Sequence, residues 1–179
     1  GSNDQDGQVS VEQAYLDFFL KDWANVRAGL VLVPVGFVNE LHEPPFFHGN
    51  ERPSVERQII PTTWRANGLG VFGDVGETLS YRTYVVTSLR AERFSSANIR
   101  SGRQNGNVER AKDFSWVGRL DYTAQPGLLA GGSLYWGDSG QTLDGGDLDV
   151  PTLIGELHVD WKLGSLELRG LYARAELDD

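Results

Sequence analysis

Residues 114–137 read FSWVGRLDYTAQPGLLAGGSLYWG, two stretches of alternating side chains separated by a Gln-Pro-Gly turn. Trp116 and Leu120 share one face of the first stretch, while Arg119 and Asp121 share the other. A period of two is typical of a β-strand with one apolar and one polar face. The segment therefore predicts an antiparallel hairpin.

The same alternation recurs along the whole chain. We expect eight strands, at Gln8–Leu20, Ala24–Val33, Asn67–Asp74, Thr78–Ser88, Phe114–Ala124, Gly127–Gly137, Thr152–Leu163 and Ser165–Leu177. Tight turns alternate with three long connections, which are Pro34–Ala66, Leu89–Asp113 and Asp138–Pro151. Alternate connections of an antiparallel meander lie at opposite ends of the sheet. The sequence thus predicts an all-β, up-and-down meander whose long loops share one end.

Composition excludes several classes of protein. The 179 residues carry 16 Lys and Arg against 25 Asp and Glu, a formal net charge of -9, which argues against nucleic acid as a partner. The absence of cysteine excludes disulfides and cysteine-ligated metals. No apolar run is long enough for a transmembrane helix, but a transmembrane strand needs only about 9–11 residues.

The positions of the aromatic residues favour a membrane barrel over a soluble one. On the apolar faces, aromatic side chains lie near the strand ends and aliphatic residues lie in the middle, as in a lipid-facing band with aromatic girdles. The expected girdle residues are Tyr81, Trp116, Tyr122, Trp136 and Trp161. A soluble core would more often hold its large aromatics in mid-strand.

The segment from Arg27 to Gly73, RAGLVLVPVGFVNELHEPPFFHGNERPSVERQIIPTTWRANGLGVFG, resembles Gram-negative outer-membrane porins related to the phosphate-selective porins O and P. The matching motifs are RAGL-V-PVG, NE-HEPP and the stretch from RP to FG, with LSYRTYVV and GRLDY further on. The resemblance implies a transmembrane β-barrel of the bacterial outer membrane that passes small hydrophilic or anionic solutes. Its partners would be outer-membrane lipid, lipopolysaccharide, and further copies of the chain.

Members of that family are expected to have a signal sequence and about 16 strands. We therefore expect a fragment: residues 1–7 as a tag remnant and lead-in, and 8–179 as a porin segment. Eight strands of a larger barrel leave two open edges, which are costly in lipid.

The polar faces of the strands are expected to line a water-filled lumen. The candidate pore-lining residues are Arg27, Arg82, Arg119, Asp121, Glu156, His158, Asp160, Lys162, Glu167 and Arg169. Both signs of charge are present in similar numbers, which predicts weak selectivity or a field across the pore rather than a strong preference for anions.

The first long connection is expected to fold inward and narrow the lumen. Its candidate charged residues are Glu40, Glu43, Arg52, Glu56, Arg57 and Arg65. The alternative is a solvated loop packed over the rim.

The second long connection reverses the acidic balance of the chain. A basic mouth is expected from Arg90, Arg93, Arg100, Arg103, Arg110 and Lys112. Such residues attract anionic solutes or lipopolysaccharide phosphates. The alternative is an ordinary solvated loop.

No catalytic constellation, cofactor or metal site is expected. His158 and Asp160 lie on one strand face without a nucleophile, and Asp144, Asp147 and Asp149 leave calcium binding open. The chain is thus expected not to be an enzyme. Two other functions stay open: a soluble eight-stranded barrel holding an apolar ligand inside, and a non-conducting structural or adhesive outer-membrane barrel.

Overall fold

The computed structural model describes residues 11–37, 39–40, 54–61, 63–95, 98–106, 111–140 and 149–178. The eight strands within them are β1 Ala14–Lys21, β2 Ala24–Leu32, β3 Arg65–Val75, β4 Leu79–Thr87, β5 Phe114–Tyr122, β6 Leu128–Asp138, β7 Pro151–Leu163 and β8 Leu166–Leu177. A short helix α1 (Val55–Gln58) and the 3-10 turns η2 (Ala91–Arg93) and η3 (Arg100–Gly102) lie in the long connections. The expected lead-in, residues 1–7, lies outside the described residues.

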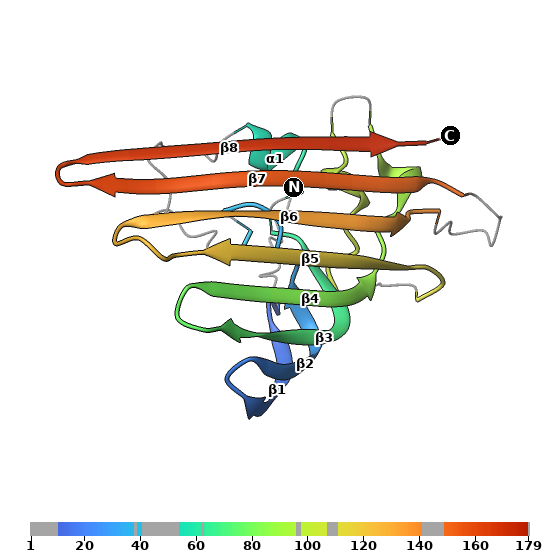
Figure 1. The fold of residues 1–179 in the computed structure, drawn as a ribbon. Helices are drawn as coiled ribbons and strands as arrows, with labels where there is room; N and C mark the ends of the chain where they lie inside the picture. The colour runs from blue at the N-terminus through green and yellow to red at the C-terminus, as the bar shows by residue number, and fades with distance from the viewer. Residues whose placement is uncertain are drawn as a thin grey trace, which may run out of the picture.

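The strands form one antiparallel sheet in chain order, from β1 to β8 (Figure 1). Tight turns join β1 to β2, β3 to β4, β5 to β6 and β7 to β8, and the long connections leave from the other end. The predicted all-β up-and-down meander is confirmed. Among the described residues, β1 pairs only with β2 and β8 pairs only with β7, so the curved sheet has two open edges.

Most strand boundaries differ from the predicted ones by one to three residues. The sequence alternation in the last strand breaks near Gly170, which predicts a bulge there, and this prediction is wrong. β7 and β8 pair without a shift from Thr152↔Leu177 to Leu163↔Leu166. A register shift instead separates Phe19 and Lys21 on β1.

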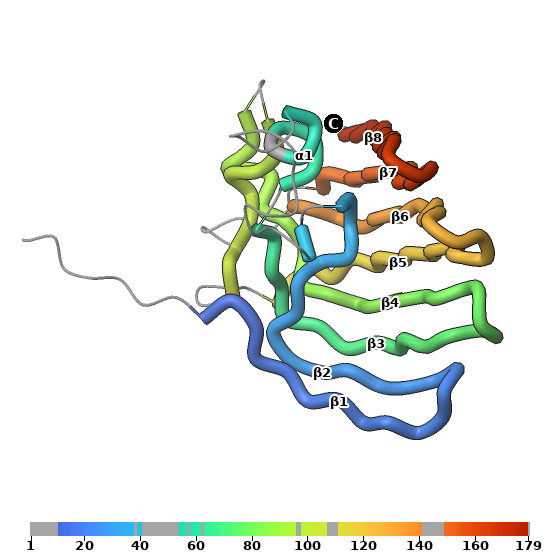
Figure 2. Tube along the Cα trace, turned by 90° about the vertical axis from the view of Figure 1, so that its left-hand side faces the viewer, coloured from blue at the N-terminus to red at the C-terminus, as the bar shows by residue number. Residues whose placement is uncertain are grey.

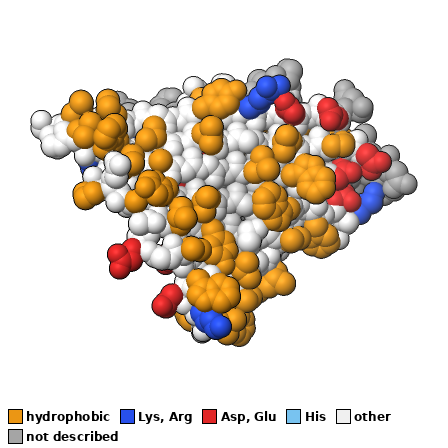
Figure 3. Space-filling model, in the orientation of Figure 1, with side chains coloured by type: hydrophobic (Ala, Val, Ile, Leu, Met, Phe, Trp, Pro, Cys, Tyr) orange, Lys and Arg blue, Asp and Glu red, His pale blue; other side chains and the backbone are white. Residues whose placement is uncertain are grey.

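The outer, convex face of the sheet is apolar and exposed. Trp136 is 62% exposed, Leu157 is 65% exposed and Leu120 is 51% exposed. All three lie at the alternate strand positions, here called the outer parity, whose side chains the sequence predicted to face lipid. Figure 3 shows apolar side chains spread over the strands, with charged side chains mainly near the rims. A water-exposed sheet face of this extent is unusual, because large apolar patches normally mark an interaction surface.

The inner, concave face is apolar and filled at the end where the long connections lie. Figure 2 shows α1 and the described part of the second long connection at the end of the sheet opposite the tight turns. The loops contribute the buried Val33, Val35, Ile60, Trp64 and Leu89. The strand residues that they cover are Val31, Ala66, Tyr84, Val86, Val117, Tyr135, Ile154 and Ala173.

This packing explains the break in alternation on β8. Leu171 packs against the core and Ala173 belongs to it, so the inner parity of β8 becomes apolar where the loops cover it. On the outer face of the same stretch, Tyr172 is followed by the charged Arg174 and Glu176. The apolar residues therefore change from the outer to the inner face of the strand near Gly170. In the described part of the chain, no helix has the length and apolarity needed to cross a bilayer.

Candidate functional site: the concave face

Asn39 joins the start and the end of the first long connection, at Val33 and Trp64, which we call the neck of the loop. The side-chain amide of Asn39 donates to the carbonyl oxygens of Val33 at 2.6 Å and Trp64 at 2.8 Å, and its oxygen accepts from the Trp64 N–H at 2.7 Å. The Val33 N–H also donates to the Trp64 carbonyl at 3.0 Å. Asn39 is fully buried, so these bonds fix where the loop enters and leaves the concave face.

Two arginines hold this loop to the wall of the sheet. Arg119 on β5 donates to the Gly36 carbonyl at 2.5 Å, and Arg82 on β4 donates to Glu40 at 2.8 Å. Gly36 has a φ of +77°, which an L side chain rarely adopts, and a Cβ there would lie 2.7 Å from Glu56 Oε1. The glycine of the PVG motif therefore allows the loop to turn against the sheet.

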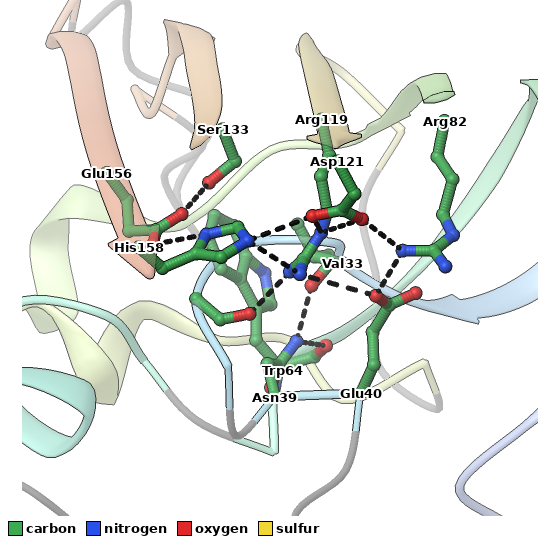
Figure 4. A network of polar contacts seen from close by, with 11 residues as sticks. Val33, Asn39, Glu40, Trp64, Arg82, Arg119, Asp121, Ser133, Glu156 and His158 are labelled. Atoms are coloured by element: carbon green, nitrogen blue, oxygen red, sulfur yellow. Dashed lines mark hydrogen bonds and ion pairs between the residues drawn. The ribbon is translucent and has the colours of Figure 1, made fainter. Parts of the chain in front are cut away.

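A buried chain of polar contacts runs from β6 to β5 beneath the loop (Figure 4). Ser133 donates to Glu156 at 2.8 Å. His158 Nδ1 lies 2.8 Å from Glu156 Oε1, and its Nε2 lies 2.9 Å from Asp121 Oδ1. Arg119 Nε completes the chain at 2.8 Å from Asp121 Oδ2. Arg119 and Asp121 pair as opposite charges, and Ser133 and His158 bind the Glu156 carboxylate, so the buried ionic groups are all hydrogen-bonded.

Phe37 extends the loop to the far strands. Its ring centroid lies 4.8 Å from that of His158 on β7, and the Arg169 guanidinium on β8 lies 5.4 Å from the same ring. Gly36, Phe37 and Glu40 therefore contact β4, β5, β7 and β8. These residues separate the apolar, filled part of the concave face from the part nearer the tight turns.

A second ion pair lies on the inner face of β1 and β2. Arg27 binds both oxygens of Asp17 through Nε and Nη2, each at 2.7 Å. Its guanidinium also lies 4.0 Å from the Tyr15 ring centroid and 4.8 Å from that of Phe72. Cation–π contacts of this kind orient the guanidinium without using its donors.

The concave face near the tight turns is open, with a cavity of about 1170 Å³. Its charged lining residues are Lys21, Asp22, Arg27, Glu40, Asp74, Arg82, Arg119 and Asp121. Four are basic and four are acidic, so the cavity is polar but balanced. Phe19, Phe37, Phe72 and Tyr84 add aromatic surface.

All the expected pore-lining residues lie on the inner parity of their strands, but they do not share one environment. Arg119, Asp121, Glu156 and His158 are buried under the loop, each at 9% exposure or less. Their prediction as water-exposed residues is corrected, because Gly36 and Phe37 of the first long connection contact Arg119 and His158. Of these four, only Arg119 and Asp121 still border the cavity. Half-buried Arg27, Arg82 and Asp160, and exposed Lys162, Glu167 and Arg169, lie toward the tight-turn end.

The predicted constriction residues do not lie together in the structure. Glu40 faces the open cavity, whereas Glu56 on α1 is 1% exposed and packs inside the loop. Arg65 begins β3 rather than ending the loop, and its Nε donates to the Asn105 carbonyl at 3.1 Å. Glu43, Arg52 and the Arg57 side chain lie outside the described residues.

The predicted basic mouth is wrong at Arg90. This side chain is 1% exposed and pairs with Glu92, because the loop folds back over it. Arg103 is half-buried and braces the first long connection through Thr63. Arg93 and Lys112 are exposed and Arg100 is half-buried, while Arg110 lies outside the described residues, as do Asp144 and Asp147.

The predicted girdle residues lie on the convex face. Trp116, Trp136, Tyr122 and Trp161 are between 37% and 62% exposed, and half-buried Tyr81 donates from its hydroxyl to the Trp23 carbonyl at 2.7 Å. Trp116 and Trp136 are register partners on β5 and β6. Exposed Trp23 and Tyr172 belong to the same surface but were missed by the sequence prediction.

Sequence reasoning also missed the residues that position the loop. Asn39 and Phe37 sit in a connection without periodicity. The NE-HEPP motif begins at Asn39 and does not include Phe37, and the resemblance gave neither residue a role. Phe72 could have been found, since it shares the inner parity of its strand with glycines Gly68 and Gly70.

A protein from Aquifex aeolicus (strain VF5), described as an uncharacterized protein, is similar to this chain. The two are 37% identical over 179 residues, which is 98% of this chain and 40% of the relative. The chain thus spans about two fifths of the length of the relative that it matches. No family model matches the chain, and no solved structure matches it.

Proposed function

We propose that this chain forms part of the wall of an outer-membrane β-barrel porin, which lets small hydrophilic or anionic solutes diffuse passively across the bacterial outer membrane. The lipid of that membrane would cover the convex face. The solutes would pass along the concave face, through the open cavity lined by Arg27, Glu40 and Arg82.

The observation that carries this proposal is the reversal of the usual faces. The large apolar side chains point outward and are exposed, whereas Arg119, Asp121, Glu156 and His158 point inward and are buried. In water the exposed apolar face would be unfavourable by roughly 25 cal/mol per Å², whereas in lipid it is the favourable arrangement. Trp and Tyr on that face suit the membrane interfaces.

The loop supports the channel part of the proposal. Gly36 and Glu40 lie against the inside of the sheet and are held there by Arg119 and Arg82. A segment in this position narrows any lumen that the sheet encloses, and the balanced charges of the cavity keep it wet.

The soluble barrel with an apolar ligand inside has less support. It requires Leu134 and Leu157 to point inward, yet they are 41% and 65% exposed on the convex face. A non-conducting structural or adhesive barrel has the same faces as a porin, and only transport distinguishes the two.

The first experiment compares folding in detergent micelles and in plain buffer, by heat-modifiable gel migration and far-UV circular dichroism. We expect β structure and a mobility shift only with detergent. A β-rich, monodisperse protein in buffer would overturn the membrane assignment.

The second experiment measures conductance of the protein, in its full natural length, in planar bilayers. We expect open-channel currents, with a reversal potential that moves when Arg82 is replaced by glutamine. Correct insertion without conductance would favour the structural barrel instead.

A further inference from the structure

Four arginines line the inner face of the strands, and they differ in how their Nε and Nη2 donors are used. These two donors form an edge that fits a carboxylate bidentately. In Arg27 both donors bind Asp17, and in Arg169 both bind Asp160. In Arg119, Nε binds Asp121 and Nη2 lies 3.2 Å from His158.

Arg82 is the exception among these described side chains. It contacts Glu40 at 2.8 Å and Asp121 at 3.5 Å, both through Nη1. No described residue bonds to its Nε or Nη2. The side chain is 33% exposed and lines the open cavity, so this edge is available to a solute.

Aromatic surface lines the same cavity as this edge. Phe72 on β3 is the register partner of Arg82 on β4, which places the two Cβ atoms roughly 4.5–5.5 Å apart. Phe19 meets Phe72 edge-on, with ring centroids 6.3 Å apart, and is 76% exposed. Both rings line the same cavity.

We propose that Arg82, Phe72 and Phe19 form a binding site for aromatic carboxylates on the concave face. The carboxylate would take the Nε–Nη2 edge of Arg82, and the ring would pack against Phe72 and Phe19. This inference rests on the proposed function, because it names the solutes that the cavity favours.

The arginine edge and the two aromatic rings together would make the site selective for solutes that carry both a carboxylate and a ring. Acetate would use the arginine alone, and benzyl alcohol would use the rings alone. Benzoate would use both, so it binds more tightly than either. Inorganic phosphate would gain the charge contact without the ring contact.

The test is block of the open channel by added solutes in planar bilayers, with the protein in its full natural length. We expect benzoate to halve the conductance at a concentration about tenfold below that needed for acetate, benzyl alcohol or phosphate. Equal block by acetate or phosphate, or no block by benzoate, would overturn the proposal.

Three variants locate the site. Arg82→Lys keeps the charge but loses the planar edge, so benzoate block should weaken about tenfold. Phe72→Leu should weaken benzoate block while leaving acetate block unchanged. The matched control is Arg174→Gln, since Arg174 is a mostly exposed arginine on the convex face, and its benzoate block should equal that of the unaltered protein.

Failure of the channel and failure of the site are distinguishable. If the protein forms no channel, the proposed function fails, and saturation-transfer NMR with benzoate in detergent micelles then decides about the site. A benzoate signal that disappears in Arg82→Lys supports the site. No signal from the folded protein overturns it.

Discussion

The two halves of the concave face are built by the same strands yet have opposite character. Near the long connections the inner parity carries Tyr84, Val117, Tyr135 and Ile154, all buried in an apolar core. Toward the tight turns the same strands carry charged residues that reach an open cavity. The residue type at a position of this face depends on whether the long connections cover that position. The first long connection forms the boundary between the two halves.

The largest expected effect comes from breaking the filled half. Trp64 is 1% exposed and its ring centroid lies 4.7 Å from that of Tyr135. Trp64→Ala should lower the free energy of unfolding by about 3–5 kcal/mol, because it leaves a large cavity. Urea titration in detergent micelles measures this. Trp136→Ala on the convex face is the control. An equal loss of unfolding free energy in that variant would show that the filled half of the concave face is not specially stabilising.

The neck of the loop gives the next effect. Asn39→Ala leaves the buried Trp64 N–H without the side-chain acceptor and removes two bonds to carbonyls. We expect a loss of about 2–3 kcal/mol in the same titration, since unsatisfied buried polar groups are costly. Asn39→Asp keeps the acceptor and should lose less. A variant as stable as the original protein would show that the neck does not anchor the loop.

A much smaller effect is expected in the open half. Arg169 pairs with Asp160 in a region that water reaches, at side-chain exposures of 28% and 14%. Arg169→Gln should therefore change the free energy of unfolding by less than about 1 kcal/mol. A loss close to that of Trp64→Ala would mean that the tight-turn half is packed as firmly as the other.

The smallest effect is on ion selectivity. Glu40→Gln removes one negative charge from the balanced cavity, so the anion-to-cation permeability ratio should rise about twofold. Arg82→Gln should lower the ratio by a similar factor. Reversal potentials across a salt gradient measure both, and shifts of the same sign in the two variants would refute the cavity as the conduction path.

The alternation of side chains was enough to predict the strands, their order and the two faces. It failed at Gly170 because the inner face of β8 meets the loop core from Leu171 onward, while the outer face carries Arg174 and Glu176, so the apolar residues change faces there. The alternation along a strand depends on its own residues, and it does not predict which distant loop will cover one of its faces.

The site was less predictable because its key contacts join distant parts of the chain. The sequence marked Arg82 and Arg119 as inward-facing but gave no sign that Gly36 and Glu40 would meet them. Arg90 and Glu56 look like solvated loop charges in the sequence, and only the folded loops bury them.

The contact between Arg119 and Gly36 has a consequence for how the protein acquires its structure. Its partners are 83 residues apart in the chain, whereas each hairpin closes over a short turn. Contacts of high sequence separation have a large entropic cost of closure, so they form after the local ones. We expect the wall of hairpins to assemble first and the loop to dock last, as a separate slow kinetic phase. Trp64 is buried against Tyr135, so we expect its fluorescence to change in that phase, which a variant keeping Trp64 as its one tryptophan can report.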